Sequence, residues 1–222
     1  MPKAPRTAPS ADTTLDDLQL SPALLALARR AVPRRYRKGV ILIQEGEFGD
    51  TLYIVLSGRI KVFSIGPNDR EITFGLYGSG EFVGEMSLDG GPRAASVITV
   101  EPTTCVVITR PTLLEHITQY PEFAFELLAK VIARARTATR DARNMALMDS
   151  YGRLVALIEE LAVPQEDGTR RLVSRLTHAE IASRIGCSRE MVSRLLKDLE
   201  RGGYTATIGR GLHILKPLPN RW

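Results

Sequence analysis

The chain has 222 residues, of which 44% are hydrophobic and 25% charged, and its formal net charge is +5. No stretch approaches the roughly 18 uninterrupted apolar residues of a membrane helix, so we expect a soluble globular protein of one large or two ordinary domains. Its two cysteines, Cys105 and Cys187, are too few for a cysteine-ligated iron–sulfur cluster and fit a cytoplasmic location.

The first segment is expected to be disordered. MPKAPRTAPSADTT is rich in Pro, Ala and Thr and lacks the apolar core of a secretory signal. We therefore predict a disordered tail over 1–20, followed by a short apolar helix at 22–32.

A glycine-rich region follows, with 11 of the 18 glycines between Gly39 and Gly91. Short β-branched segments lie between these glycines and predict strands at 40–43, 51–56, 59–65, 71–77, 95–100 and 105–109. The letters LSG at 56–58 predict a tight hairpin corner. Short strands at regular spacing indicate an antiparallel sandwich or barrel, so we expect one β-domain over 21–120.

In the segment GEMSLDGGPRAAS at 84–96, the acid Glu85 and the base Arg93 lie eight positions apart, with mostly small residues between and around them. Backbone N–H groups after a glycine can bind an anion when no side chain blocks the approach. Arg93 would supply a positive charge for a phosphate, and Glu85 is suited to accept a hydrogen bond from a ribose hydroxyl. From composition alone, a surface turn with solvated charges is an equally good interpretation.

Two helices are predicted next, at 110–119 with Thr109 as its cap and at 121–148. Apolar residues on the longer helix recur at helical spacing and become small towards its end: Phe123, Leu127, Val131, Ala135, Ala138, Ala142 and Met145. Such a stripe can pack on the β-domain. Because small residues let two helices approach closely, we favour a homodimer seam along 121–148.

The last third begins at Asp149, a predicted cap for a helix at 150–161. From Ser150 onward it carries 12 Lys/Arg against 8 Asp/Glu. In LTHAEIASRIGCSREMVSRLLKDLERGG, Thr177 and Glu180 form a capping box, Gly186 ends the first helix, and Ser188 caps the second. Two helices joined by a short glycine turn predict a helix-turn-helix, and the strand candidates around Gly209 predict a wing.

The charges on the second helix favour DNA as the partner of this region. Arginine can pair with guanine and glutamate with the cytosine amine when the first turns of a recognition helix enter the major groove. A solvated charged face is the alternative, but the charges coincide here with the caps and the glycine turn. The DNA-binding candidates are Thr177, Ser188, Arg189, Glu190, Ser193, Arg194 and Lys197.

GCSREMVSRLLKDLE resembles the recognition element of the CRP/FNR family of bacterial transcription regulators, and the likeness extends from about residue 20. It implies an α+β protein: a jelly-roll-like antiparallel β-roll that binds a cyclic nucleotide, a dimerisation helix over 121–148, and a winged helix-turn-helix over 149–222. Arg189, Glu190 and Arg194 match the residues with which the catabolite-regulator branch reads a TGTGA-type half-site. The resemblance therefore implies a homodimer on a double-stranded palindromic operator, in contact with RNA polymerase if the protein is an activator.

The same resemblance identifies 84–96 as a phosphate cassette and extends the site to the long helix. The nucleotide-binding candidates are Gly84, Glu85, Met86, Ser87, Arg93, Ala94, Ala95, Ala138 and Thr139. Ala138 and Thr139 align with the Thr-Ser pair that holds the base in bacterial cyclic-AMP receptors, and Arg134 is placed to reach Glu85. The resemblance favours cyclic AMP as the ligand. Because Ala138 lacks the hydroxyl that would read the adenine amine, cyclic GMP, cyclic di-GMP and a regulator without ligand stay as alternatives.

Other classes fit the residues less well. Relative to the family, His116, His178 and His213 are not placed for haem, and no metal-ligand set or Ser-His-Asp arrangement stands out, so neither a metal nor an enzyme is expected. A cyclic-nucleotide-binding regulatory subunit that does not act on DNA is a distant alternative, because it would lack the DNA-reading helix.

Overall fold

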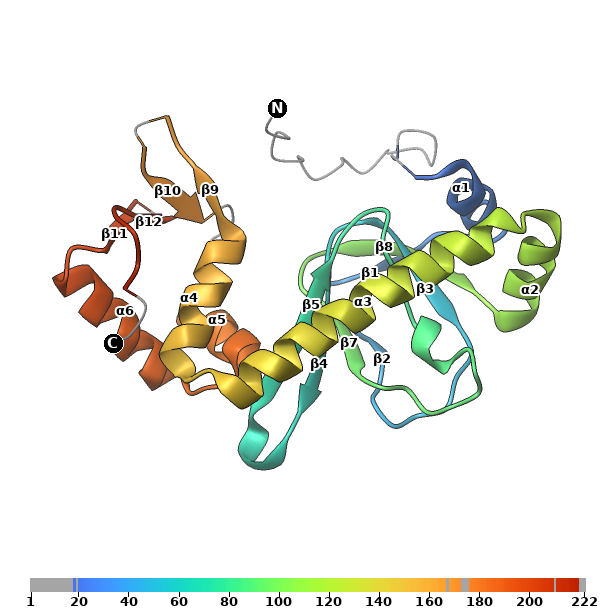
Figure 1. Cartoon of the computed structure of the whole chain (residues 1–222). Helices are drawn as coiled ribbons and strands as arrows, with labels where there is room; N and C mark the ends of the chain where they lie inside the picture. The colour runs from blue at the N-terminus through green and yellow to red at the C-terminus, as the bar shows by residue number, and fades with distance from the viewer. Residues whose placement is uncertain (1–17, 19, 167, 173–175, 210, 220–222) are drawn as a thin grey trace. The chain divides into compact units, whose positions relative to one another are not determined.

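The computed structural model describes residue 18 and residues 20–166, 168–172, 176–209 and 211–219 (Figure 1). The predicted disordered tail lies almost entirely outside these residues. The chain divides into two compact units. One contains the chain up to Ser64 together with Phe74–Ala135, and the other contains Ile65–Thr73 and the chain from Arg136 onward.

Two four-stranded sheets form the predicted β-roll, with the strand orders β1-β8-β3-β6 and β2-β7-β4-β5. The strands are β1 (Arg34–Tyr36), β2 (Ile41–Ile43), β3 (Leu52–Ser57), β4 (Ile60–Ile65), β5 (Glu71–Tyr77), β6 (Phe82–Val83), β7 (Ser96–Thr99) and β8 (Thr103–Ile108). The sequence did not predict β1 or β6. Strand β1 is almost wholly polar and β6 has two residues, so neither carries an alternating apolar pattern long enough to recognise.

The predicted hairpin at 56–58 is wrong, because β3 and β4 belong to different sheets. Gly58 has a φ of +81°, and a Cβ there would lie 2.3 Å from the carbonyl oxygen of Pro102. A glycine is therefore required both by the backbone angle and by the close approach of another strand connection. The chain does turn sharply at these residues, as predicted, but the turn leads from one sheet to the other.

The β-roll core is closed by α1 (Pro22–Ala28), which starts at the cap Ser21. Leu24 and Leu27 of this helix are buried with Leu52, Phe82 and other apolar residues of the roll. Helix α2 (Arg110–Gln119) has the predicted cap, because the Thr109 hydroxyl accepts a hydrogen bond from the backbone N–H of Thr112.

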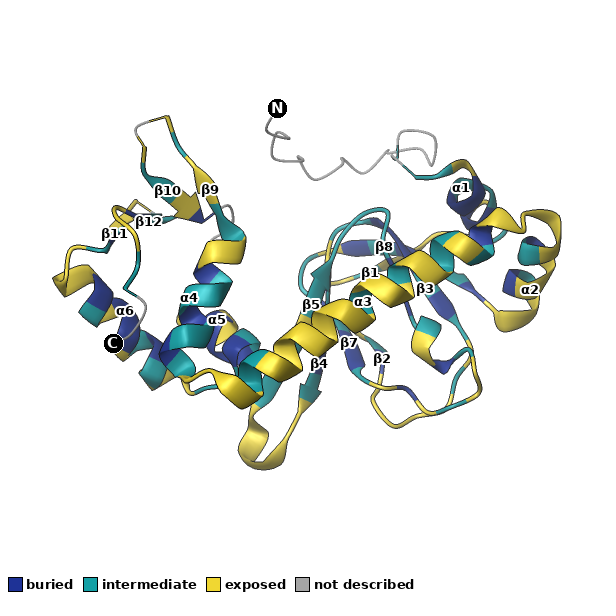
Figure 2. Cartoon of the chain, viewed as in Figure 1, coloured by how far each residue is buried: buried dark blue, intermediate teal, exposed yellow. Residues whose placement is uncertain are grey.

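The long helix α3 (Glu122–Leu147) corrects the first part of the predicted dimer stripe. Phe123 is completely buried and Leu127 packs against the same core, so these two members of the stripe face their own β-roll. The later members Val131, Ala135, Ala138 and Ala142 are exposed. A further apolar row is also exposed, with Phe125 75%, Leu128 51% and Ile132 42% exposed, and Figure 2 shows α3 as largely exposed. The helical period alone does not show which part of an apolar stripe the β-roll covers.

The second unit contains a third four-stranded sheet, in the order β11-β12-β10-β9, and three further helices. Its elements are α4 (Ser150–Leu161), β9 (Ala162–Pro164), β10 (Arg170–Leu172), α5 (His178–Ile185), α6 (Arg189–Arg201), β11 (Thr205–Ile208) and β12 (Gly211–Ile214). Strands β11 and β12 form the predicted wing. Leu154 and Ile158 of α4 pack with Val192 and Leu199 of α6 in the core of this unit.

Arg153 joins three helix ends within the second unit. Its Nε donates to the Ile185 carbonyl at the end of α5 (2.7 Å), and its Nη1 donates to the Met148 carbonyl just after α3 (2.6 Å). Asp149 caps α4 as predicted, since its carboxylate accepts from the Gly152 N–H. The end of α3, the start of α4 and the end of α5 are thus held by one guanidinium.

Candidate functional site

The segment 84–96 forms a tight turn after β6. Gly84 has a φ of +100°, and a Cβ there would lie 2.5 Å from the Thr51 carbonyl oxygen and 2.9 Å from Nη1 of Arg93. Residues Glu85–Ser87 then form one turn of 3₁₀ helix. A side chain at position 84 would close this space, so the predicted need for glycine is explained by both conformation and room.

Arg93 is only 8% exposed, and protein groups hold it in place. Its Nη1 donates to the Gly84 carbonyl (3.0 Å) and to Ser87 Oγ (2.7 Å), and its Nη2 donates to Thr51 Oγ1 (2.9 Å). Burial lowers the pKa of Arg93, while Tyr53, Asp50 and Glu85 act in the opposite direction. Arginine stays protonated in proteins, so the turn contains a fixed positive charge with donors left over.

Glu85 is the matching negative group. Its side chain is 5% exposed and forms an ion pair with Arg134 of α3, with 2.6 Å between Oε1 and Nη1. This is the contact expected from the sequence. The Arg134 guanidinium also donates to the Phe82 carbonyl (2.5 Å) and lies over the Tyr77 ring, 4.6 Å from its centroid.

A second ion pair lies one helical turn away and was not predicted. Lys130 Nζ is 2.7 Å from Oε1 of Glu81, while Arg134 Nη2 is 3.8 Å from the other oxygen of the same carboxylate. Both sets of residues are four positions apart, so the spacing of Glu81 with Glu85 and of Lys130 with Arg134 was the available signal. These pairs attach the first half of α3 to the segment before and after β6.

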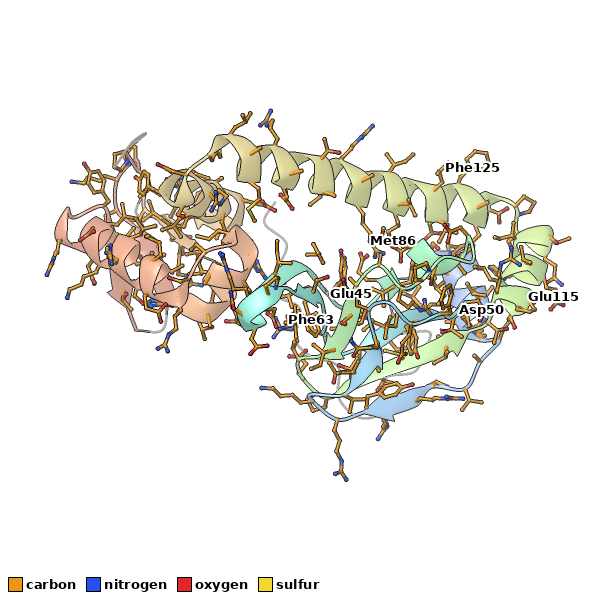
Figure 3. The ribbon with its side chains drawn as sticks, turned by 90° about the horizontal axis from the view of Figure 1, so that it is seen from below. Glu45, Asp50, Phe63, Met86, Glu115 and Phe125 are labelled. Atoms are coloured by element: carbon orange, nitrogen blue, oxygen red, sulfur yellow. The ribbon has the colours of Figure 1, made fainter. Side chains whose placement is uncertain are left out.

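The remaining candidates around this turn have different surroundings. Ser87 is buried, and its hydroxyl contacts Gly84 and Arg93, so its hydrogen bonds position the arginine. Met86 is 65% exposed (labelled in Figure 3), Ala94 is exposed and Ala95 is half-buried. Around the charged pair the surface therefore has little side-chain bulk apart from Met86.

Ala138 and Thr139 are exposed on α3, one turn after Arg134. Their part in a ligand site stays a prediction.

The helix-turn-helix has the caps that its sequence predicted. Thr177 Oγ1 accepts from the Glu180 N–H while Glu180 accepts from the Thr177 N–H, and Gly186 ends α5 with a φ of +63°. Ser188 Oγ accepts from the Met191 N–H at the start of α6 (3.1 Å). Within the folded unit the hydroxyls of Thr177 and Ser188 therefore serve as helix caps.

The outer face of α6 is charged and open. Arg189, Glu190, Arg194 and Lys197 are exposed, and among the residues that the structure describes none of these four forms an ion pair. Ser193 is half-buried and contacts His178, with 2.7 Å between Oγ and Nδ1, a partner that the sequence did not indicate. Four charged side chains without partners on one face leave their hydrogen-bonding groups available to a polar surface such as a DNA groove.

Other kinds of site find little support in the described part of the chain. It contains no group of three or more metal-ligating side chains. No described helix is long and apolar enough to cross a membrane. Cys105 is fully buried, and burial raises the pKa of its thiol to about 12, which fits the predicted role of a small core residue.

Comparison with known proteins agrees with both halves of the chain. A cyclic nucleotide-binding domain model matches residues 33–120, and a Crp-like helix-turn-helix domain model matches residues 152–217. The CRP-like cAMP-activated global transcriptional regulator of Mycobacterium tuberculosis is 32% identical over 196 residues, which cover 86% of this chain and 88% of the relative. The CRP-like protein Clp of Xanthomonas euvesicatoria is 32% identical over 189 residues, covering 80% and 81% of the two chains.

Among solved structures, the c-di-GMP responsive global regulator CLP of Xanthomonas campestris is similar with a TM-score of 0.77 at 26% identity. The match covers 88% of this chain and 99% of the other.

Proposed function

The chain belongs to the CRP-like transcription regulators, which join a cyclic nucleotide-binding domain to a Crp-like helix-turn-helix, and we propose that its ligand is cyclic AMP. The observation that carries this proposal is the pairing of one buried acid with one buried base in a single turn. Arg93 is 8% exposed and the Glu85 side chain 5% exposed, so both charges are set in place before a ligand arrives. A 3′,5′-cyclic ribose phosphate has one phosphate for Arg93 and one free ribose hydroxyl for Glu85.

The relatives differ in the ligand that their names print, cAMP for one and c-di-GMP for another. The charge of the cassette favours the smaller ligand. Segment 84–96 contains one basic residue, Arg93, against the acids Glu85 and Asp89. A cyclic dinucleotide carries two phosphates, and a second phosphate would meet a carboxylate without a matching cation in this segment.

Isothermal titration calorimetry with cyclic AMP, cyclic GMP and cyclic di-GMP tests this assignment. Cyclic AMP is expected to bind most tightly, and Arg93→Ala to weaken it by about tenfold or more, because hydrogen bonds to charged groups contribute about 1.5–3 kcal/mol. Arg59→Ala is the matched control, since Arg59 is exposed and pairs with Glu101 outside the cassette. Thermal unfolding establishes that each variant is folded.

Tighter binding of another nucleotide would replace cyclic AMP as the ligand. Unchanged affinity in Arg93→Ala would show that the phosphate binds elsewhere.

We also propose that the regulator acts as a homodimer on a TGTGA-type palindrome. The exposed row of Phe125, Leu128 and Ile132 on α3 supports a second copy as partner, because a single chain leaves this row in water. Two copies would present two α6 helices to half-sites about one DNA turn apart. Arg189, Glu190 and Arg194 are the proposed base-reading residues, and transcription with purified RNA polymerase would distinguish activation from repression.

A further inference from the structure

Tyr77 of β5 lies against Gly75, two residues earlier on the same strand. A Cβ placed on Gly75 would lie 2.7 Å from the Tyr77 hydroxyl oxygen and 2.8 Å from Cζ. The backbone of Gly75 is not in the left-handed region, so the glycine is explained by space and not by conformation. The Tyr77 phenol therefore occupies the space that a side chain at position 75 would need.

The ring of Tyr77 is also held from the side of α3. The Arg134 guanidinium lies 4.6 Å from its centroid, a cation–π contact, and Arg134 forms the ion pair with Glu85. Tyr77 further packs against the buried cluster that contains Ile43 and Val83, next to Gly84. Tyr77 and the proposed ribose-binding carboxylate are thus joined through one guanidinium.

In none of these contacts does the hydroxyl group form a hydrogen bond. Tyr77 is half-buried, and its hydroxyl makes no hydrogen bond with any residue that the structure describes. Burial raises the pKa of Tyr77, with Glu85 acting in the same direction and Arg134 opposing it, so the phenol stays neutral near pH 7. A phenylalanine would offer the same ring to Arg134. The tyrosine adds a neutral group that can both donate and accept a hydrogen bond.

The chemistry of a nucleotide brings its base close to this group. In a 3′,5′-cyclic nucleotide the free hydroxyl is on C2′, and the base is attached to the neighbouring C1′. A ligand held by Arg93 at the phosphate and by Glu85 at the 2′-hydroxyl must therefore place its base within a few ångström of the groups around Glu85. Arg134 and Tyr77 are such groups.

We propose that the Tyr77 hydroxyl accepts a hydrogen bond from the 6-amino group of the adenine, with Gly75 providing the space in which the phenol is held. This inference rests on the proposed cyclic-AMP function and adds a specificity-determining residue to it.

Calorimetry with two probes tests the proposal: cyclic AMP, and the 3′,5′-cyclic monophosphate of purine riboside, which lacks only the 6-amino group. Tyr77→Phe is expected to weaken cyclic AMP by about three- to tenfold, the value of one net hydrogen bond, and to leave the analogue unchanged. Tyr120→Phe removes a hydroxyl from the end of α2 and is the matched control. Gly75→Ala, which crowds the phenol, is expected to weaken cyclic AMP as well.

Three results would overturn the proposal. Equal loss for both probes in Tyr77→Phe would make Tyr77 a residue that only positions Arg134, and no loss for either would remove it from the site. Wild-type affinity in Gly75→Ala would show that the phenol is not held as described. If the wild-type protein binds neither probe, the cyclic-AMP assignment itself fails, whereas failure of the variants alone leaves that assignment intact.

Discussion

His116 is an ionisable residue in the β-roll core that the candidate site does not use. It is fully buried, and neither ring nitrogen has a hydrogen-bond partner among the described residues. The ring packs between Tyr120 (4.8 Å between centroids) and Phe123 (5.2 Å). Burial lowers the pKa of His116 and the positive charge of Arg30 acts in the same direction, while the Ala23 backbone and Glu122 oppose them. The neutral imidazole is therefore the form that this core accepts.

The stability of the protein is expected to fall in mild acid for this reason. Since the pKa of His116 is lower in the folded chain than its ordinary 6.5, the unfolded chain binds the proton first as the pH drops. The free energy of unfolding should decrease below about pH 6.5 and become level, for this group, below the folded-state pKa. Denaturant unfolding at a series of pH values checks this, with His116→Phe retaining an aromatic ring and losing this part of the slope. Identical slopes in the two proteins would assign the acid sensitivity to other groups.

Among the elements, α3 has one face that packs on the β-roll and another that is apolar and exposed. One face is fastened to the β-roll by Phe123 and by the ion pairs of Lys130 and Arg134. The other exposes Phe125, which points away from the sheets in Figure 3, along with Leu128 and Ile132. Of the 26 residues of this helix, Phe123 is the buried one, so packing within its own chain contributes little to the stability of the helix. An exposed apolar row of this kind is typical of a surface that binds a partner.

Leu128→Asp is expected to separate the proposed homodimer. A carboxylate in the middle of an apolar seam would lose water without gaining a partner, which costs several kcal/mol. Sedimentation equilibrium should then give a mass near the 24.5 kDa of one chain instead of twice that value. Leu114→Asp on α2 is the control, because Leu114 is 50% exposed and Leu128 51%. A variant Leu128→Asp that remains dimeric would show that the copies meet elsewhere.

On α6, the contribution of base contacts to DNA binding can be distinguished from that of positive charge alone by comparing two arginines at different ends of the helix. Arg194→Ala is expected to weaken binding to a TGTGA palindrome by about tenfold, because one bidentate contact to guanine contributes about 1–3 kcal/mol of discrimination. Arg201→Ala removes the same charge at the far end of the helix, where the side chain is 69% exposed and pairs with Asp198, and should have a smaller effect. Fluorescence anisotropy with the palindrome and a scrambled duplex measures both. Equal losses in the two variants on both duplexes would reduce Arg194 to a phosphate contact.

For the molecule as a whole, a contact can be predicted from the sequence when its two residues are close together along the chain, and not when they are far apart. The caps Thr109, Asp149 and Ser188 were predicted correctly, because a cap and its N–H partner are three residues apart. The glycine at 84 was also predicted, since its need follows from the turn itself. By contrast, the hydrogen bond that Arg93 donates to Thr51 joins residues 42 positions apart, and the sequence around neither residue predicts it. The same reason applies to the partner choice of β3 and β4.

The length of α3 has a mechanical consequence. At about 1.5 Å per residue its 26 residues make a rod of about 39 Å, and the last ion pair to the β-roll is at Arg134. The 13 residues that follow Arg134, up to Leu147, add about 20 Å of continuous helix beyond this ion pair. A tilt of the helix at Arg134 would therefore displace its far end by an amount proportional to this length. Arg153 donates to the carbonyl of Met148, directly after the helix, and to the carbonyl of Ile185 at the end of α5, so such a displacement would be passed on to the helix-turn-helix.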